Sequence, residues 1–140
     1  MPPSSPPDIF LVSSCLVGLC TRYDGQIKPD HTCIKRLKNS IWIPICPEQL
    51  GGLPTPREAA DISGGDGAQV LSGQAHVLTR SGSDITAQFI KGAEQVLNIA
   101  QSQKITAVLL KSKSPSCAVT GIVGVTAALL LKHGFDVQEY

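Results

Sequence analysis

The sequence predicts an α/β fold with a mainly parallel sheet flanked by helices. Short apolar runs alternate along the chain with stretches of helical periodicity, which is typical of parallel strands joined by right-handed helical crossovers. The chain has 140 residues, of which 42% are hydrophobic, enough for one core. We therefore expect a single domain over residues 8–140. The preceding segment, 1–7, contains four prolines and is predicted to be a disordered lead-in.

Three apolar runs, at residues 9–14, 41–45 and 105–110, show no strict alternation with polar residues. Strands that are buried on both faces have this pattern, so each run is predicted to be a strand of the parallel sheet. Pro44 has no N–H to donate, which places it near the end of its strand or on a sheet edge. Weaker patterns predict two further strands, at 74–80 and 135–138.

A first helix is expected up to about Lys38, with Asp30 as its capping residue and with Ile34 and Leu37 on one face. The segment 47–73 is instead rich in glycine and proline, and we predict a loop with little regular structure there. Loops of this length are unusual in compact domains and are often functional.

The longest predicted helix is capped by Ser83 or Asp84 and ends near Gln103. Its apolar face recurs at steps of three and four residues, namely Phe89, Ala93, Val96, Leu97 and Ala100. A last helix is predicted over 125–133, and Gly134 has the right position to end it in a left-handed conformation.

Composition excludes several classes of function. The net charge is +1 and the isoelectric point is about 7.6, which gives no indication of binding to nucleic acid or to an anionic membrane. No apolar stretch approaches the ~20 residues of a membrane span, and the first residues do not look like a signal peptide. Five cysteines cannot form a closed set of intrachain disulfides. We therefore expect a cytoplasmic protein with reduced thiols.

Three of the cysteines share a position relative to the predicted strands. Cys15 follows the strand 9–14, Cys46 follows 41–45, and Cys117 follows 105–110 after six intervening residues. Ligands of open parallel sheets bind outside the carboxyl ends of the strands, so these thiols are expected to meet at one edge of the sheet. Cys20 and Cys33 have no such position and are expected to be ordinary packing or loop residues.

Three converging thiolates are compatible with several kinds of site. A structural zinc site needs four ligands, commonly in closely spaced pairs; no C-x-x-C pair exists here, and His31, His76 and His133 lack ligand-like spacing. In a [4Fe–4S] cluster held by three cysteines, one iron would have no protein ligand and would act as a Lewis acid. The plainest alternative is that these cysteines are small buried core residues.

The residues around these cysteines form distinctive motifs. They are SSCLVG around Cys15, CPEQLGGLPTPR beginning at Cys46, KSKSPSC ending at Cys117, and GVTAALL beginning at Gly124. Together they resemble the domain of unknown function 523 family, whose characterised members include thiouracil desulfidase. The resemblance runs from about Ile9 to the C-terminus, and the motif beginning at Cys46 is its most specific part.

The resemblance implies a Rossmann-like α/β domain in which Cys15, Cys46 and Cys117 hold a [4Fe–4S] cluster. The fourth iron would bind the sulfur of a small thiolated substrate, a nucleobase such as 2-thiouracil, and the enzyme would remove that sulfur by hydrolytic, non-redox C–S cleavage. Glu48 and Ser114 match residues implicated at the substrate. Glu48 would activate water or carry a proton, and Ser114 would hydrogen-bond the ring.

The sequence departs from the family pattern at one place. Members usually carry a longer segment between the SPSC and GVTAA motifs, whereas only residues 118–123 intervene here. A loop that covers the pocket or binds substrate is therefore expected to be short or absent, which keeps open the hypothesis of a non-catalytic iron–sulfur or ligand-binding module. A structural zinc protein is a second alternative. Asp24 and Arg57 are expected either to orient the loop or substrate, or to form a surface ion pair.

Overall fold

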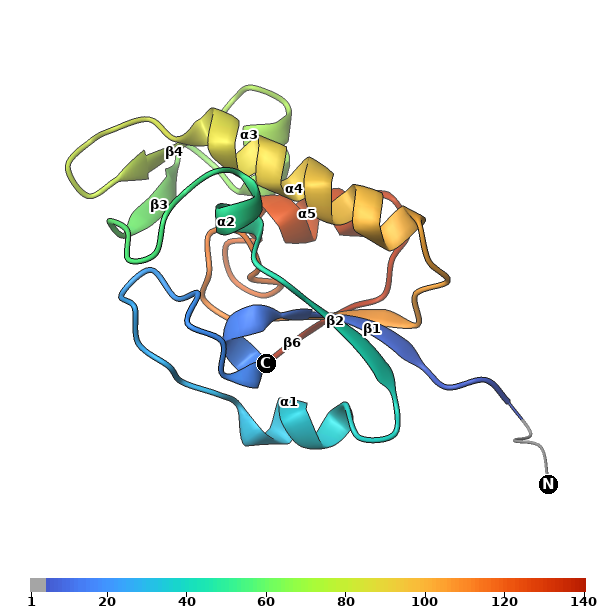
Figure 1. Cartoon of the computed structure of the whole chain (residues 1–140). Coiled ribbons are helices and arrows are strands. Elements are labelled where there is room, and N and C mark those ends of the chain that lie inside the picture. The colour runs from blue at the N-terminus through green and yellow to red at the C-terminus, as the bar shows by residue number, and fades with distance from the viewer. Residues whose placement is uncertain (1–4) are drawn as a thin grey trace.

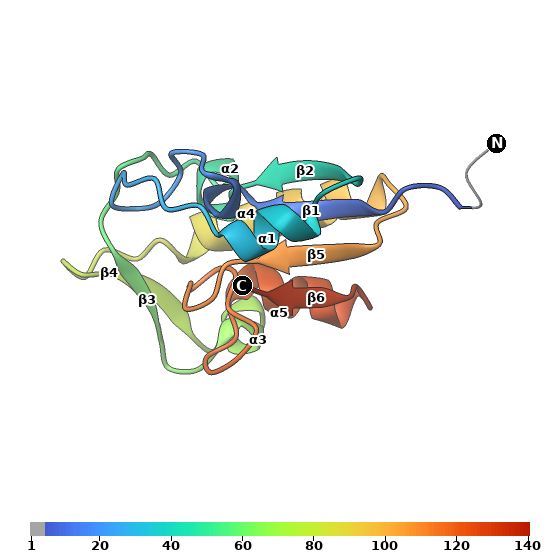
Figure 2. The ribbon, with the colours of Figure 1, turned by 90° about the horizontal axis from the view of Figure 1, so that it is seen from below.

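The computed structural model describes residues 5–140, and its centre is a four-stranded parallel sheet. The strand order is β2-β1-β5-β6, and each neighbouring pair is parallel (Figure 2). The bounds are β1 (Ile9–Ser13), β2 (Ile41–Ile45), β5 (Ala107–Leu110) and β6 (Val137–Glu139). These strands match four of the predicted runs, and Pro44 lies in the edge strand β2 as expected.

Helices cover both faces of this sheet, as Figure 1 shows. Helix α1 (His31–Arg36) and the short 3₁₀ helix η1 (Ser14–Val17) lie on one face, and α4 (Thr86–Gln101) and α5 (Val125–Lys132) lie on the other. The alternation of side chains along β1 explains this arrangement. Phe10 and Val12 pack toward α1, whereas Leu11 packs against the core formed with α4 and α5. The predicted α/β fold with a mainly parallel, Rossmann-like sheet is thus confirmed.

The predicted helices are found with small differences at their ends and faces. Asp30 caps α1 by accepting the backbone N–H of Cys33 at 2.8 Å. The expectation that Ile34 lies on the buried face is wrong, because Cys33 and Leu37, four residues apart, form that face and Ile34 is 38% exposed. Gly134 follows α5 with a φ of +82°, so the predicted left-handed end of that helix is confirmed.

The prediction of a loop with little structure over 47–73 is wrong. This segment contains helix α2 (Pro47–Leu50), strand β3 (Ala60–Ser63) and helix α3 (Gly67–Leu71). The start of α3 has a local signal, a capping box in which Asp66 and Gln69 satisfy each other's backbone N–H groups. Strand β3 has no comparable signal, because it is stabilised by antiparallel pairing with β4 (His76–Thr79) in a separate two-stranded sheet.

The remaining expectations concern the N-terminal segment and membranes. Of the predicted lead-in 1–7, residues 1–4 lie outside the described part of the chain, and residues 5–7 are exposed and outside any helix or strand. Among residues 5–140, no helix is both long enough and apolar enough to cross a membrane.

Candidate functional site

A pocket of about 470 Å³ lies at the carboxyl ends of β1, β2 and β5. The chain moves outward from β1 to β2 in its first half and from β5 to β6 in its second half, so the order of strands reverses between β1 and β5. Such a switch point is where open parallel sheets bind ligands. The β3–β4 pair lies beyond the same ends of the strands (Figures 1 and 2) and contributes Asp61, with Arg80 just after it, to the pocket wall.

Three cysteines from three different strand ends line this pocket. Cys15 lies in η1 directly after β1, Cys46 is the N-cap residue of α2 directly after β2, and Cys117 ends the segment that follows β5. The structure therefore brings together the cysteines that the sequence singled out. Cys20 is instead exposed, and Cys33 is buried in the core on the α1 face of the sheet.

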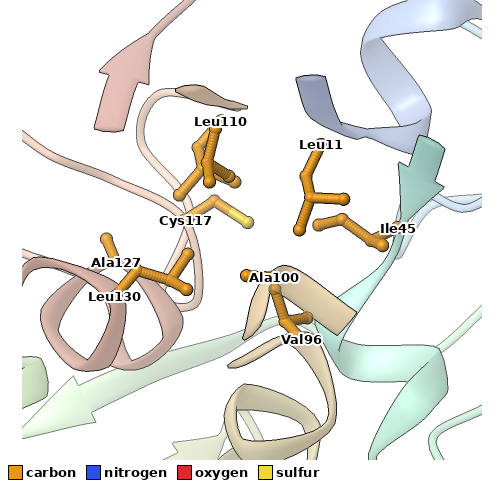
Figure 3. Packing of buried hydrophobic residues seen from close by; sticks show 9 residues of the cluster. Leu11, Ile45, Val96, Ala100, Leu110, Cys117, Ala127 and Leu130 are labelled. Atoms are coloured by element: carbon orange, nitrogen blue, oxygen red, sulfur yellow. The ribbon is translucent and has the colours of Figure 1, made fainter. Parts of the chain in front are cut away.

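Cys117 is the most buried of the three pocket cysteines and is only 3% exposed. It belongs to the core cluster on the α4 and α5 side of the sheet, and Figure 3 shows its sulfur pointing in among apolar side chains that include Leu11 and Leu110. An apolar lining on one side of a metal centre excludes water and lowers the local dielectric constant.

The environment of the three thiols favours their protonated forms. Burial raises the pKa of Cys46 to about 11, and the negative charge of Glu48 adds to this effect. Burial, followed by Glu48, also raises the pKa of Cys15, and it raises that of Cys117 well above its ordinary value. A thiol must lose its proton to bind a metal, so the positive charge of a bound cation would have to offset this burial.

Ser114 lines the pocket and also shapes the turn that leads into Cys117. Its Oγ accepts the backbone N–H groups of Ser116 and Cys117, each at 3.2 Å, and its carbonyl accepts the N–H of Ala118 at 3.0 Å. These contacts use the hydroxyl as an acceptor, which leaves its own proton for another group. Ser114 therefore holds Cys117 in place and can still donate a hydrogen bond into the pocket.

Glu48 lies between a cysteine and an arginine on the pocket wall. Its Oε2 is 3.7 Å from the Sγ of Cys46, with the thiol as donor, and 4.0 Å from Nη2 of Arg57. Arg57 also donates to the carbonyls of Thr21 at 2.9 Å and Pro54 at 3.1 Å. Arg57 thus joins the loop after β1 to the segment that carries Glu48, in agreement with its expected orienting role.

The other residue that was expected to orient the loop or substrate, Asp24, forms an ion pair. Arg22 donates to its carboxylate from Nε at 3.1 Å and from Nη2 at 2.9 Å. Hydrogen bonds from Arg22 and from the backbone of Gln26 hold the pKa of Asp24 down to about 2. Asp24 therefore holds Arg22, which itself lines the pocket.

Several lining residues were not assigned a role from the sequence. Ser13 and Lys111 are among them, and both have a local signal, because each stands at or just after the carboxyl end of a buried strand. Asp61 and Arg80 have no such signal, since the antiparallel β3–β4 pairing brings them to the site.

Three cysteine thiols at one pocket are the donor type that iron–sulfur clusters use. Within residues 5–140, no three or more His, Cys, Asp or Glu side chains are arranged to hold a single ion. In an iron–sulfur cluster each thiolate binds a different iron, so its ligands stand further apart than the four ligands of one zinc ion. His76, one of the histidines considered as a fourth zinc ligand, is exposed and lies 3.2 Å from Asp84.

Fold and site together define an α/β protein with three cysteines gathered at the switch point of a parallel sheet. The family model described as 2-thiouracil desulfurase matches residues 10–139, and the chain belongs to this family. This confirms the resemblance carried by the cysteine motifs.

Two similar proteins agree with this assignment. The solved structure of "[4Fe-4S]-dependent thiouracil desulfidase TudS" matches with a TM-score of 0.73 and 36% identity, covering 94% of this chain and 90% of that one. A protein of Bacillus subtilis (strain 168), "Uncharacterized protein YbbK", is 41% identical over 142 residues, covering 92% of this chain and 93% of the relative.

Proposed function

We propose that this chain is a [4Fe–4S]-dependent desulfidase that removes sulfur from a thiolated nucleobase such as 2-thiouracil. The observation that carries the proposal is the convergence of Cys15, Cys46 and Cys117, from three strand ends, on one pocket. Membership of the 2-thiouracil desulfurase family and the printed description of the solved relative TudS support both the cofactor and the substrate class.

The proposed reaction replaces a thiocarbonyl sulfur by oxygen. Water adds to the carbon of C=S, the C–S bond breaks, and the products are a carbonyl compound and hydrogen sulfide, with no net oxidation or reduction. A bound cluster would supply an iron without a protein ligand, a Lewis acid that prefers the soft sulfur of the substrate.

Protons and orientation would come from the protein's own side chains. The Glu48 carboxylate faces the pocket beside Cys46, where it would take a proton from the attacking water and deliver one to the departing sulfur. The hydroxyl proton of Ser114 is available to a ring nitrogen or carbonyl oxygen of the base. Arg57 would keep the Glu48 carboxylate on the pocket side through its contacts with the loop after β1.

Anaerobic reconstitution with iron and sulfide tests the cofactor. We expect about four irons and four sulfides per chain, with loss of the cluster when Cys15, Cys46 or Cys117 is replaced by serine. Cys20→Ser is the matched control, because Cys20 is exposed and outside the pocket, and it should load normally. If the wild-type protein loads a cluster and the three serine variants load it equally well, the proposed ligands are contradicted. Zinc in protein purified without oxygen would favour a structural zinc site.

The loaded protein with 2-thiouracil tests the activity. Glu48→Gln keeps the size of the side chain but cannot accept a proton, so we expect an intact cluster and a loss of sulfide release of at least ~100-fold. Ser114→Ala is expected to weaken substrate binding. An intact wild-type cluster with no sulfide release from any thiolated base would instead indicate a non-catalytic binding module.

A further inference from the structure

Ser13 is a buried hydroxyl between two segments of the site that are far apart in sequence. It is the last residue of β1 and is 3% exposed. Its Oγ accepts the backbone N–H of Lys111 at 3.0 Å and donates to the Sγ of Cys117 at 3.6 Å. Lys111 and Cys117 are the two ends of the segment that follows β5, so one hydroxyl anchors both ends to the central strand.

The direction of these hydrogen bonds follows from the chemistry of a hydroxyl. A serine Oγ has one proton and two acceptor positions. The N–H of Lys111 can only donate, so it occupies an acceptor position and leaves the proton for the sulfur of Cys117. Because both side chains are buried, water does not compete for this proton, and the low local dielectric constant strengthens the contact.

A hydrogen bond to a cysteine that ligates a cluster changes the electronic properties of that cluster. The donor draws electron density from the sulfur and stabilises the reduced, more negative state, which raises the reduction potential. The same withdrawal makes the irons less electron-rich and therefore better Lewis acids.

We propose that Ser13 is a positioning residue whose hydroxyl, through its hydrogen bond to the sulfur of Cys117, raises the reduction potential of the cluster. The inference rests on the proposed function for the presence of the cluster and for Cys117 as its ligand. It adds a residue that acts on the cluster through Cys117.

The test measures the reduction potential of the anaerobically reconstituted protein by redox titration with optical and EPR detection. Ser13→Ala removes the donor, and we expect its potential to shift to lower values at unchanged iron and sulfide content. Ser13→Thr keeps a hydroxyl and should retain a potential near that of the wild type. Ser14→Ala is the matched control, since the Oγ of this neighbouring buried serine is hydrogen-bonded to Oγ1 of Thr21 at 2.6 Å, and its potential should not change.

Each outcome decides the proposal. A loaded Ser13→Ala protein with the wild-type potential overturns the role of Ser13 while leaving the proposed function intact. If Ser13→Ala does not retain a cluster, a Ser13→Thr protein that does retain one supports the role of the hydroxyl. Loss of the cluster from both variants overturns the proposed role of the hydroxyl. A wild-type protein that binds no cluster overturns the proposed function together with this inference.

Discussion

Helix α2, which follows Cys46 and carries Glu48, is held against α4 by two glycines. A Cβ added at Gly92 would lie 1.9 Å from the carbonyl oxygen of Pro47, and one added at Gly51 would lie 2.0 Å from the carbonyl oxygen of Gln88. Neither Gly51 nor Gly92 has a positive φ in the left-handed region, so the close approach of the two helices, and not the backbone conformation, requires glycine here.

Gly92→Ala should therefore destabilise the protein even though alanine is the better helix former. A Cβ contact with a backbone oxygen below 3.0 Å is not tolerated, so the two helices must separate by about 1 Å. Overpacking of this kind costs up to ~3 kcal/mol, and the oxygen of Pro47 belongs to the backbone and cannot rotate away. The gain in helix propensity is ~1 kcal/mol. The expected net loss in the free energy of unfolding is about 2 kcal/mol.

Urea unfolding of the reduced, cluster-free protein, followed by circular dichroism, measures this loss directly. Gln95→Ala is a suitable control because Gln95 is exposed on the same helix, and it should change the free energy of unfolding by less than ~0.5 kcal/mol. The displaced α2 would also move Cys46 and Glu48, so we expect lower cluster content in Gly92→Ala after reconstitution. A Gly92→Ala protein as stable as the wild type would refute the close-packing argument.

Two further predictions concern stability near Cys117. Thr126→Val should leave the free energy of unfolding unchanged or raise it by up to ~1 kcal/mol, because the Thr126 hydroxyl is buried with no hydrogen-bond partner in the described part of the chain. A loss of about 1 kcal/mol in a urea melt would contradict this. Glu139→Gln should cost about 1 kcal/mol at pH 7, since the Glu139 carboxylate accepts hydrogen bonds from Val119 N at 2.7 Å, Thr120 N at 3.1 Å and Thr120 Oγ1 at 2.7 Å. Burial opposes ionisation of Glu139, but these hydrogen bonds outweigh it and lower its pKa below the ordinary 4.5. The contribution of the Glu139 carboxylate to stability is therefore complete above pH 4.5 and is lost as the pH falls through the lower pKa of the folded state. The free energies of unfolding of the wild type and Glu139→Gln should converge in acid. A difference between them that does not depend on pH would count against the reasoning.

The short segment after Cys117 shows how far the sequence motifs reach. They indicate that only residues 118–123 separate Cys117 from the last helix. They do not indicate that the Glu139 carboxylate, in β6, accepts hydrogen bonds from backbone N–H groups of this segment. That contact joins residues about 20 positions apart and depends on the pairing of β5 with β6. Likewise, no local pattern shows that β3 pairs with β4 and brings Asp61 and Arg80 to the pocket.

The sequence by itself determined the parallel sheet, the three longest helices (α1, α4 and α5) and the three cysteines to examine. Runs of buried strand residues, helical periodicity and caps such as Asp30 are local, and the carboxyl ends of parallel strands must share one edge. Only the tertiary structure decided that Cys33 rather than Ile34 is buried in α1, that α2 packs on Gly92, and that the hydroxyl of Ser13 reaches the sulfur of Cys117. Ser13 and Cys117 are 104 positions apart, and their contact depends on the register and packing of the whole sheet, which no local pattern encodes.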